Sequence, residues 1–179
     1  MDFSKLEKNI VEVLRENQLK LGYAKETVRL YYPLQSLQRF LATDCDLAGM
    51  EKGLEAFVDY TAQRLGKVDI SHKGERFCFR IPPEGNAYVH EHMGDTAFLQ
   101  ELIQLVQEHG KQMEDVFAIF HRYSEKVQIQ EMDNGEFDYL VWFEDGKPDE
   151  FKYCLKDEGF HITYHRYTPE DYEDLFPTF

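Results

Sequence analysis

Apolar and polar residues alternate over most of the segment from Val127 to Tyr164, which is the pattern of half-buried β-strands. Short stretches rich in Gly, Asn, Asp and Pro interrupt the alternation and indicate turns. Because these turns are short, we expect consecutive strands to pair in antiparallel fashion. The segment therefore predicts a four-stranded antiparallel meander, with strands over Val127–Met132, Glu136–Phe143, Phe151–Leu155 and Phe160–Arg166.

The first turn of this meander contains Asn134-Gly135, a pair that suits a two-residue type I′ turn because both positions take positive φ. A two-residue turn places Glu131 opposite Asp138. The second strand carries apolar residues on both faces, so we expect it to be central and covered on both sides. In the third strand Cys154 shares a face with two lysines, and we expect it to be only partly buried.

Elsewhere apolar residues recur every three or four positions, which predicts amphipathic helices. Most of these segments begin near a capping residue or a Pro, and several end near a Gly. The segment Lys25–Tyr32 fits either a short strand or a helical turn. The predicted helices cover Phe3–Leu21, Leu34–Leu41, Leu47–Leu65, Phe98–Val106 and Met113–Phe120, with a short final helix after Thr168.

Three short strands are predicted between the third and fourth helices, over Val68–Ile70, Phe77–Ile81 and Tyr88–His90. A Lys-Gly pair at 73–74 and the run Pro82–Asn86 supply the turns between them. The N-terminal half therefore has the order helix, short strand, helix, helix, hairpin. That order resembles a winged helix.

The chain is thus predicted to have an α+β fold. Residues 1–93 are expected to form a three-helix, winged-helix-like unit with a β-hairpin. Residues 94–179 are expected to form two helices, the four-stranded antiparallel meander and a short C-terminal helix. Of the 179 residues, 42% are hydrophobic and 15% aromatic, enough for a core without disulfides. The pattern leaves open whether the two parts are separate or form one integrated domain.

The net charge of −14 is spread unevenly along the chain. Residues 1–93 hold 13 Lys and Arg against 14 Asp and Glu, a net charge of −1, whereas residues 94–179 hold 7 against 20, a net charge of −13. Solvated loops that keep the protein soluble explain such a charge, and a surface for a basic partner is the sharper interpretation. Under either interpretation the C-terminal half repels nucleic acid and anionic lipid.

The three cysteines, Cys45, Cys78 and Cys154, are odd in number and show no C-x-x-C spacing, which argues against a disulfide framework or a zinc ribbon. The N-terminus lacks a basic region followed by an apolar run, and no apolar run is long enough to cross a bilayer. We therefore expect a cytoplasmic protein. The sequence shows no phosphate-binding loop, dinucleotide-binding glycine motif, zinc-protease motif or nucleophile elbow, so no cofactor is predicted.

DNA binding is one function to consider for a winged-helix order. In DNA-binding members the third helix enters the major groove and presents basic or amide side chains. Here the exposed face of Leu47–Leu65 carries mixed charges, from Glu51, Lys52, Glu55, Asp59, Gln63 and Arg64. That mixture lacks a basic stripe. Nucleic acid is therefore not the expected partner, although fold alone does not decide function.

His90 and His92 lie at the end of a predicted strand, where residues two apart share a face about 7 Å apart. Two imidazoles so placed can bind one metal ion. Such a site needs a third and usually a fourth ligand, which the sequence does not identify. A solvated pair of histidines is the other interpretation.

Tyr31, Tyr32 and Tyr88 are candidates for an aromatic surface that binds a partner. Large aromatic residues also dominate protein cores, so core packing is the alternative for each of them. The sequence does not separate these two roles.

Two segments, Leu21–Leu34 and Arg76–Gly85, resemble a family of bacterial domains of unknown function. They cover 24 of the 179 residues and contain no catalytic signature. The resemblance implies a bacterial, cytoplasmic protein that forms one family-sized unit. It implies no activity and supplies no site residues.

The leading hypothesis is a non-enzymatic protein-binding or regulatory module, with an acidic, aromatic C-terminal surface that meets a protein partner. A basic protein is the partner that the charge favours. The charge of residues 94–179 and the missing catalytic motifs favour it. A metal-dependent enzyme that uses His90 and His92 is one alternative, and a winged-helix DNA-binding regulator is another. No membrane partner is expected, and the oligomeric state is not predicted.

Overall fold

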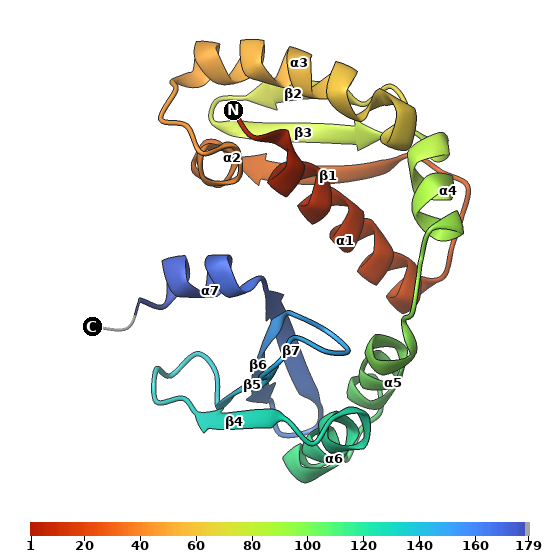
Figure 1. The fold of residues 1–179 in the computed structure, drawn as a ribbon, viewed down its shortest axis with the longest axis vertical. Helices are drawn as coiled ribbons and strands as arrows, with labels where there is room; N and C mark the ends of the chain where they lie inside the picture. Colours follow the sequence, from red (N-terminus) through yellow and green to blue (C-terminus); the bar gives the residue numbers. More distant parts are fainter. Residues whose placement is uncertain (178–179) are drawn as a thin grey trace. The chain divides into compact units, whose positions relative to one another are not determined.

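The computed structural model describes residues 1–177, in which seven helices and two antiparallel sheets are present (Figure 1). The predicted α+β class is confirmed. The chain divides into two compact units, Met1–Gly94 and Asp95–Phe179. None of the helices in the described part of the chain combines the length and the apolar composition that a bilayer-spanning segment requires.

The N-terminal unit has the winged-helix-like order of elements that the sequence predicts. In chain order its elements are α1 (Phe3–Leu21), β1 (Val28–Pro33), α2 (Leu34–Leu41), α3 (Leu47–Leu65), β2 (Asp69–Lys73), β3 (Arg76–Ile81) and α4 (Pro83–Glu91). The three strands form an antiparallel sheet in the order β1-β3-β2. The segment that the pattern left open between strand and helix therefore forms β1.

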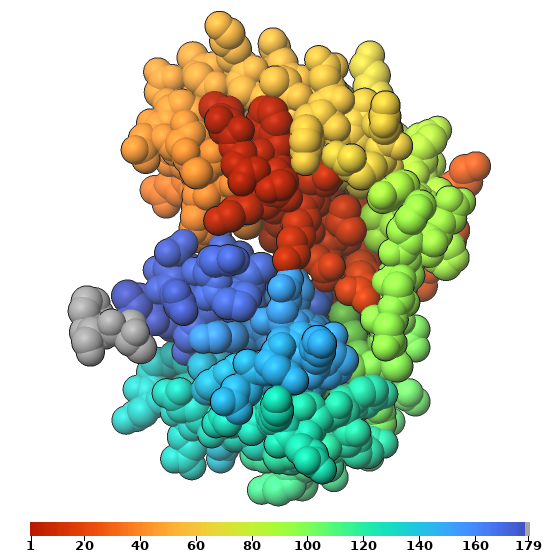
Figure 2. All heavy atoms as spheres, in the orientation of Figure 1, coloured from red at the N-terminus to blue at the C-terminus, as the bar shows by residue number. Residues whose placement is uncertain are grey.

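The core of this unit lies between the helices and one face of the sheet. Leu6, Ile10 and Leu14 recur at a spacing of four on α1, and all three are fully buried. The rings of Phe57 on α3 and Phe79 on β3 meet edge to face, 6.2 Å apart. Burying a side chain of this size contributes about 1.5–3 kcal/mol. Helices α1 and α3 lie side by side, as Figures 1 and 2 show in red and in orange to yellow.

Helix α4 occupies the residues for which a turn and a third strand were predicted, so that prediction is wrong. Pro82 is the N-cap and Pro83 lies in the first turn, a position that proline tolerates because no amide hydrogen is needed there. Gly85 marks close packing. A Cβ at Gly85 would lie 2.5 Å from the backbone oxygen of Leu65, so only glycine lets α4 approach the end of α3 this closely.

Buried polar side chains connect α4 to α1. The Nε2 atom of Gln18 donates to Oδ1 of Asn86 at 2.8 Å and lies 2.9 Å from the Asn86 carbonyl oxygen. Asn86 Nδ2 in turn donates to the carbonyl oxygen of Ala24 at 2.6 Å. Because buried amides are costly unless hydrogen-bonded, this arrangement favours the observed docking of the two helices.

The C-terminal unit contains the predicted meander. In chain order its elements are α5 (Ala97–Val106), α6 (Met113–Tyr123), β4 (Val127–Glu131), β5 (Tyr139–Phe143), β6 (Lys152–Asp157), β7 (Ile162–Tyr167) and α7 (Pro169–Leu175). The sheet order β4-β5-β6-β7 confirms the meander. Helices cover both sides of its central strands.

Helices α5 and α6 cover one face of this sheet through aromatic contacts. Phe98 on α5 meets Phe143 at 4.9 Å and Tyr153 at 5.7 Å, each edge to face. Phe120 on α6 packs on the same two rings. Such pairs contribute about 0.5–1.5 kcal/mol beyond the area that they bury.

The opposite face is covered by α7 and the residues around it. Phe137, Leu140 and Cys154 form a small buried cluster on which Tyr172 and Phe176 pack. The expectation that Cys154 is only partly buried is therefore wrong, because α7 covers the side that it shares with the lysines. Burial raises the pKa of the Cys154 thiol to about 12, which leaves it protonated and unreactive at neutral pH.

The register between β4 and β5 differs from the prediction by one residue. Glu131 lies opposite Tyr139, and Ile129 lies opposite Val141. The connection is a longer loop, in which Asn134 Oδ1 accepts hydrogen bonds from the backbone N–H groups of Glu136 and Phe137, each at 2.9 Å. Because Asn134 closes this loop through its side chain, the two-residue turn does not form, and Glu131 does not face Asp138.

Candidate functional site

A hollow of about 630 Å³ in the C-terminal unit is lined mainly by carboxylates. Its walls come from the start of α6, the end of β4 with the loop that follows, the start of β5 and the end of β6. We call this hollow the acidic cleft. Its five acidic side chains are Glu114, Glu131, Asp133, Asp138 and Asp157.

Backbone hydrogen bonds hold the centre of the acidic cleft in place. The Asp138 N–H donates to the carbonyl oxygen of Leu155 at 2.8 Å, and its own carbonyl oxygen accepts from Met132 at 2.9 Å. The Asp138 carboxylate accepts from the backbone N–H of Asp157 at 2.8 Å. These bonds fix the position of the Asp138 carboxylate beside the backbone of Asp157.

The acidic cleft has little compensating positive charge. Lys156 Nζ lies 3.5 Å from Asp138 Oδ1. Within residues 1–177, no Lys or Arg pairs with the other four carboxylates of the cleft. Uncompensated charges of one sign around a hollow attract ligands of the opposite sign.

The remaining lining of the acidic cleft is largely apolar. It includes Met113, which is buried, and Met132 and Tyr139, which are half-buried. The Tyr139 ring packs edge to face on Phe117 at 5.1 Å. Lys and Arg side chains place their methylene groups on such surfaces while their charges reach polar atoms beyond. Thioether side chains adapt to ligands of different shape.

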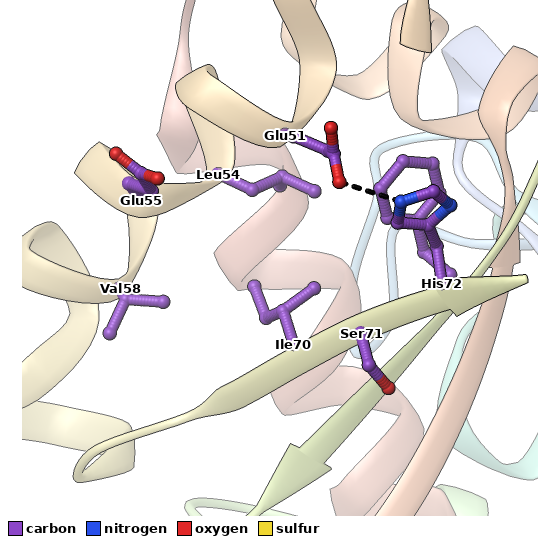
Figure 3. Close-up of a pocket in the computed structure, with 8 residues that line it drawn as sticks. Glu51, Leu54, Glu55, Val58, Ile70, Ser71 and His72 are labelled. Carbon is purple, nitrogen blue, oxygen red and sulfur yellow. Dashed lines mark hydrogen bonds and ion pairs between the residues drawn. The ribbon is translucent and has the colours of Figure 1, made fainter. Parts of the chain in front are cut away.

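A second hollow, of about 210 Å³, lies between α3 and β2 in the N-terminal unit. Figure 3 shows Leu54 and Val58 from α3 facing Ile70 from β2, with Glu51 pointing toward His72. The His72 Nε2 atom lies 2.6 Å from Glu51 Oε1. This ion pair connects the helix to the hairpin at one side of the hollow.

Both ring nitrogens of His72 face acceptors, since Nδ1 lies 2.8 Å from the carbonyl oxygen of Gly74. Only the imidazolium form donates from both nitrogens. Accordingly, the hydrogen bond to Gly74, followed by that to Glu51, raises the pKa of His72. Through these two hydrogen bonds His72 connects α3 to the hairpin of β2 and β3.

His90 and His92 do not lie on a strand. His90 belongs to α4 and His92 is its C-cap, where positions two apart point in nearly opposite directions. His90 stacks on Tyr23 and His92 stacks on Tyr88, both at 4.1 Å. The argument that placed the two imidazoles on one face is therefore wrong.

The hypothesis that His90 and His92 bind one metal ion depended on their sharing one face of a strand, and they do not share a face. The His92 Nδ1 atom is also engaged, 2.8 Å from the carbonyl oxygen of Tyr88. Among the described residues, no group of three or more His, Cys, Asp or Glu side chains is arranged to hold a metal ion. Metal analysis of the purified protein tests the hypothesis directly.

The three candidate tyrosines lie in different environments. Tyr31 is 52% exposed on the outer face of the N-terminal sheet. Tyr32 points the other way into the core, where its hydroxyl donates to Asn9 Oδ1 at 2.8 Å. Tyr88 is half-buried against His92. The structure therefore does not join them into one aromatic surface, and Tyr31 is the most accessible of the three.

The family of the chain follows from a comparison with known families. Residues 3–176 match the family model described as "Domain of unknown function, E. rectale Gene description (DUF3877)". The chain belongs to this family. The predicted resemblance to a family of unknown function is thereby confirmed, and the DUF3877 match extends over both compact units. No curated protein and no solved structure matches this DUF3877 member.

From the sequence, only Glu131 and Asp138 were placed together, as a solvated contact, and the acidic cleft of this DUF3877 member was not predicted. Glu114, Asp138 and Asp157 are far apart along the chain, and only sheet pairing and the packing of α6 bring them together. The available signal was the excess of acidic residues after residue 94. That signal indicates a charged half of the chain but not a particular cleft.

Proposed function

We propose that this protein is a binding module, and that its acidic cleft takes up a basic segment of a partner protein. The observation that carries the proposal is the set of five carboxylates, of which Asp138 pairs with Lys156, beside the apolar side chains of Met113, Met132 and Tyr139. Such a lining suits the methylene groups of Lys and Arg, and the carboxylates suit their charges.

The size and openness of the acidic cleft support a polypeptide as the ligand. A hollow of about 630 Å³ has room for several side chains. Its carboxylates come from α6, the end of β4 with the loop that follows, the residue before β5 and the end of β6, so they belong to several elements. A segment with two or three basic residues can therefore pair each of its charges with a separate carboxylate of the cleft.

Long-range electrostatics add to this local arrangement. Residues 94–179 carry a net charge of −13. A field of one sign raises the rate at which an oppositely charged partner associates, and added salt weakens the effect. We therefore expect the basic partner to associate with this protein faster at low salt than at high salt.

We also infer a bacterial, cytoplasmic setting. The family resemblance supports the first part, and the three free cysteines support a reducing compartment. Cell fractionation of the native host tests this inference.

The test is titration of the full chain with a fluorescent lysine-rich peptide, followed by anisotropy at low and high salt. The informative variant carries Glu131→Gln and Asp133→Asn, two exposed positions of the cleft. The matched control carries Glu170→Gln and Glu173→Gln on α7, which removes the same charge from exposed positions outside the cleft lining.

We expect the cleft variant to weaken peptide binding about tenfold, because two exposed charge contacts contribute about 0.2–1 kcal/mol each and the local field also falls. The α7 control should stay within about twofold of the wild type, since only the general field changes. Equal losses in both variants would show that net charge acts without the cleft, and an absence of binding by the wild type would refute the proposal.

A further inference from the structure

The sheet of the N-terminal unit has two different faces. The side chains of Phe77, Phe79 and Ile81 point toward the helices and are buried. The alternate residues of the strands point outward and are exposed or half-buried. Five of them form what we call the cationic sheet face, namely Arg29, Tyr31, Lys73, Arg76 and Arg80.

Strand pairing collects these side chains from three separate strands. Arg29 on β1 lies opposite Arg80 on β3, and Lys73 on β2 lies opposite Arg76 on β3. Paired strands are about 4.8 Å apart, whereas positions four apart on one strand, such as Arg76 and Arg80, are about 13 Å apart. The face therefore carries two pairs of cations towards opposite ends of β3, with Tyr31 and Cys78 opposite each other between them.

Tyr31 lies among these cations and contributes an accessible aromatic ring. The Arg76 guanidinium lies 4.6 Å from the centre of that ring. Tyr31 and Arg76, together with Lys73, help to line a hollow of about 510 Å³ on this side of the sheet. A guanidinium held over an aromatic ring is already oriented for a carboxylate, which lowers the entropic cost of binding.

Most of this positive charge is uncompensated. Arg80 pairs with Asp69, at 2.7 Å from Nε and 2.6 Å from Nη2. Over the described residues, 1–177, no carboxylate pairs with Arg29, Lys73 or Arg76. The chain carries a net charge of −14, so acidic side chains are abundant, yet none of them forms an ion pair with these three cations in the described residues.

The cross-strand pairing makes this arrangement unfavourable in the absence of a ligand. Like charges placed directly opposite each other on neighbouring strands destabilise a sheet. This sheet contains two such pairs, Arg29 with Arg80 and Lys73 with Arg76. In the first pair Arg80 also lies opposite Asp69 and is compensated by it, whereas among the described residues no carboxylate pairs with Lys73 or Arg76. An anionic ligand relieves the repulsion between Lys73 and Arg76, and a local rule broken without compensation within the fold is typical of binding sites.

We propose that the cationic sheet face binds a short acidic segment of a protein partner. Its carboxylates pair with Arg29, Arg76 and Lys73, and an apolar residue of the segment packs on Tyr31. The planar guanidinium groups suit bidentate contacts with carboxylates. This site belongs to the N-terminal unit and is independent of the acidic cleft.

A short peptide fits this face better than a nucleic acid does. Duplex binders typically neutralise about 6–10 phosphates, whereas this face offers three free cations. Helix α3, which borders β2, exposes Glu51 and Glu55. Those acidic residues repel a long polyanion that extends past the sheet.

The test measures the anisotropy of a fluorescent glutamate-rich peptide with one central tyrosine, titrated with the full chain at low salt. A single-stranded DNA oligonucleotide of similar charge serves as the competing probe. The informative variant is Arg29→Gln with Arg76→Gln. The matched control, Lys5→Gln with Lys52→Gln, removes two exposed charges from helices of the same unit.

We expect the wild type to bind the peptide, the Arg29→Gln, Arg76→Gln variant to bind it about tenfold more weakly, and the control to stay within about twofold. Tyr31→Ala should weaken binding further than Tyr31→Phe, because Phe keeps the ring. Far-ultraviolet circular dichroism verifies that each variant is folded. No binding by the wild type, equal losses in variant and control, or tighter binding of the oligonucleotide would each overturn the proposal.

Discussion

The hydroxyl of Tyr153 donates a 2.6 Å hydrogen bond to Oδ2 of Asp149 inside the C-terminal unit. Arg166 completes the group, with Nη2 3.2 Å from the same carboxylate oxygen and Nε donating to the Tyr153 hydroxyl at 3.1 Å. Burial, as the main cause, raises the pKa of Tyr153, so its hydroxyl remains a donor at neutral pH. The three residues connect the loop before β6 to β6 and β7.

Removing the charge of Asp149 should destabilise this unit strongly. The Arg166 side chain is only 3% exposed, and Asp149→Asn removes a carboxylate that lies 3.2 Å from this buried guanidinium. We expect a loss of about 3 kcal/mol in the free energy of unfolding, the usual cost of breaking a buried ion pair from one side. Urea unfolding followed by the fluorescence of Trp142, the single tryptophan of the chain and a residue of this unit, provides the measurement.

Tyr153→Phe is the matched control for Asp149→Asn, because it removes the hydrogen bonds of the Tyr153 hydroxyl with Asp149 and Arg166 and leaves the ion pair in place. Its expected cost is about 1.5–2 kcal/mol, the low end for hydrogen bonds to charged groups, because the packing of the ring is kept. If Asp149→Asn costs no more than Tyr153→Phe, the pair does not hold the loop in the way described.

The ion pair between His72 and Glu51 should be visible in the pH dependence of the N-terminal unit. The hydrogen bond to the Gly74 carbonyl and the Glu51 carboxylate raise the pKa of His72 above its usual 6.5. A raised pKa in the folded state means that His72 stabilises the fold below the unfolded-state pKa, and that this contribution is lost as pH rises through the folded-state value. Proton NMR titration should show a His72 pKa that falls in the Glu51→Gln variant.

Unfolding experiments check the direction in which the contribution of His72 to stability changes with pH. The stability difference between wild type and His72→Gln should be larger at pH 5.5 than at pH 8.5, values that we choose to bracket the ordinary histidine range of about 6.5. His121→Gln, at an exposed position on α6, is the matched substitution measured alongside. A His72 pKa that does not respond to Glu51→Gln would contradict the assignment.

Gly85 and Gly53 should respond to alanine in opposite ways. A Cβ at Gly85 meets the Leu65 backbone oxygen at 2.5 Å, and backbone atoms of a packed helix cannot move aside cheaply. We expect Gly85→Ala to cost about 1–3 kcal/mol, the range for overpacking.

A Cβ at Gly53 meets only the flexible end of the Met1 side chain, so Gly53→Ala should gain up to about 1 kcal/mol of helix propensity. Thermal unfolding by circular dichroism distinguishes the two variants. A similar change in both would show that α4 does not depend on close packing at Gly85.

Ala42 ends α2 in the left-handed region, with φ 49° and ψ 55°. Residues with a Cβ pay about 1–2 kcal/mol there, and glycine does not. Part of the gain is offset by the greater freedom of glycine in the unfolded chain. We expect Ala42→Gly to stabilise the protein by about 0.5–1 kcal/mol.

Ala56→Gly, at an exposed position in the middle of α3, is the control for Ala42→Gly and should cost about 1 kcal/mol. Chemical unfolding of the two variants under the same conditions gives the comparison. A loss of stability in Ala42→Gly would argue against the left-handed cap.

Local patterns were enough to predict most elements of this protein. The period of three to four residues predicts the helices, and the alternation after residue 127 predicts the four strands and their order. Residues 82–90 were mispredicted, because Pro82-Pro83 followed by Gly85 has the composition of a turn. The buried contacts of Gly85 with α3 and of Asn86 with α1 stabilise a helix instead, and those contacts involve residues distant in the sequence.

The sequence by itself determined the fold class, the order of the meander and the strong negative charge of the C-terminal half, because periodicity and composition are local properties. Only the tertiary structure decided which side chains meet. Asp138 joins Glu114 and Asp157 in the acidic cleft, and Lys73 lies opposite Arg76 on the cationic sheet face, through pairing register and helix docking. A shift of one residue in register sends every side chain of a strand to the other face, so composition alone cannot specify these groupings.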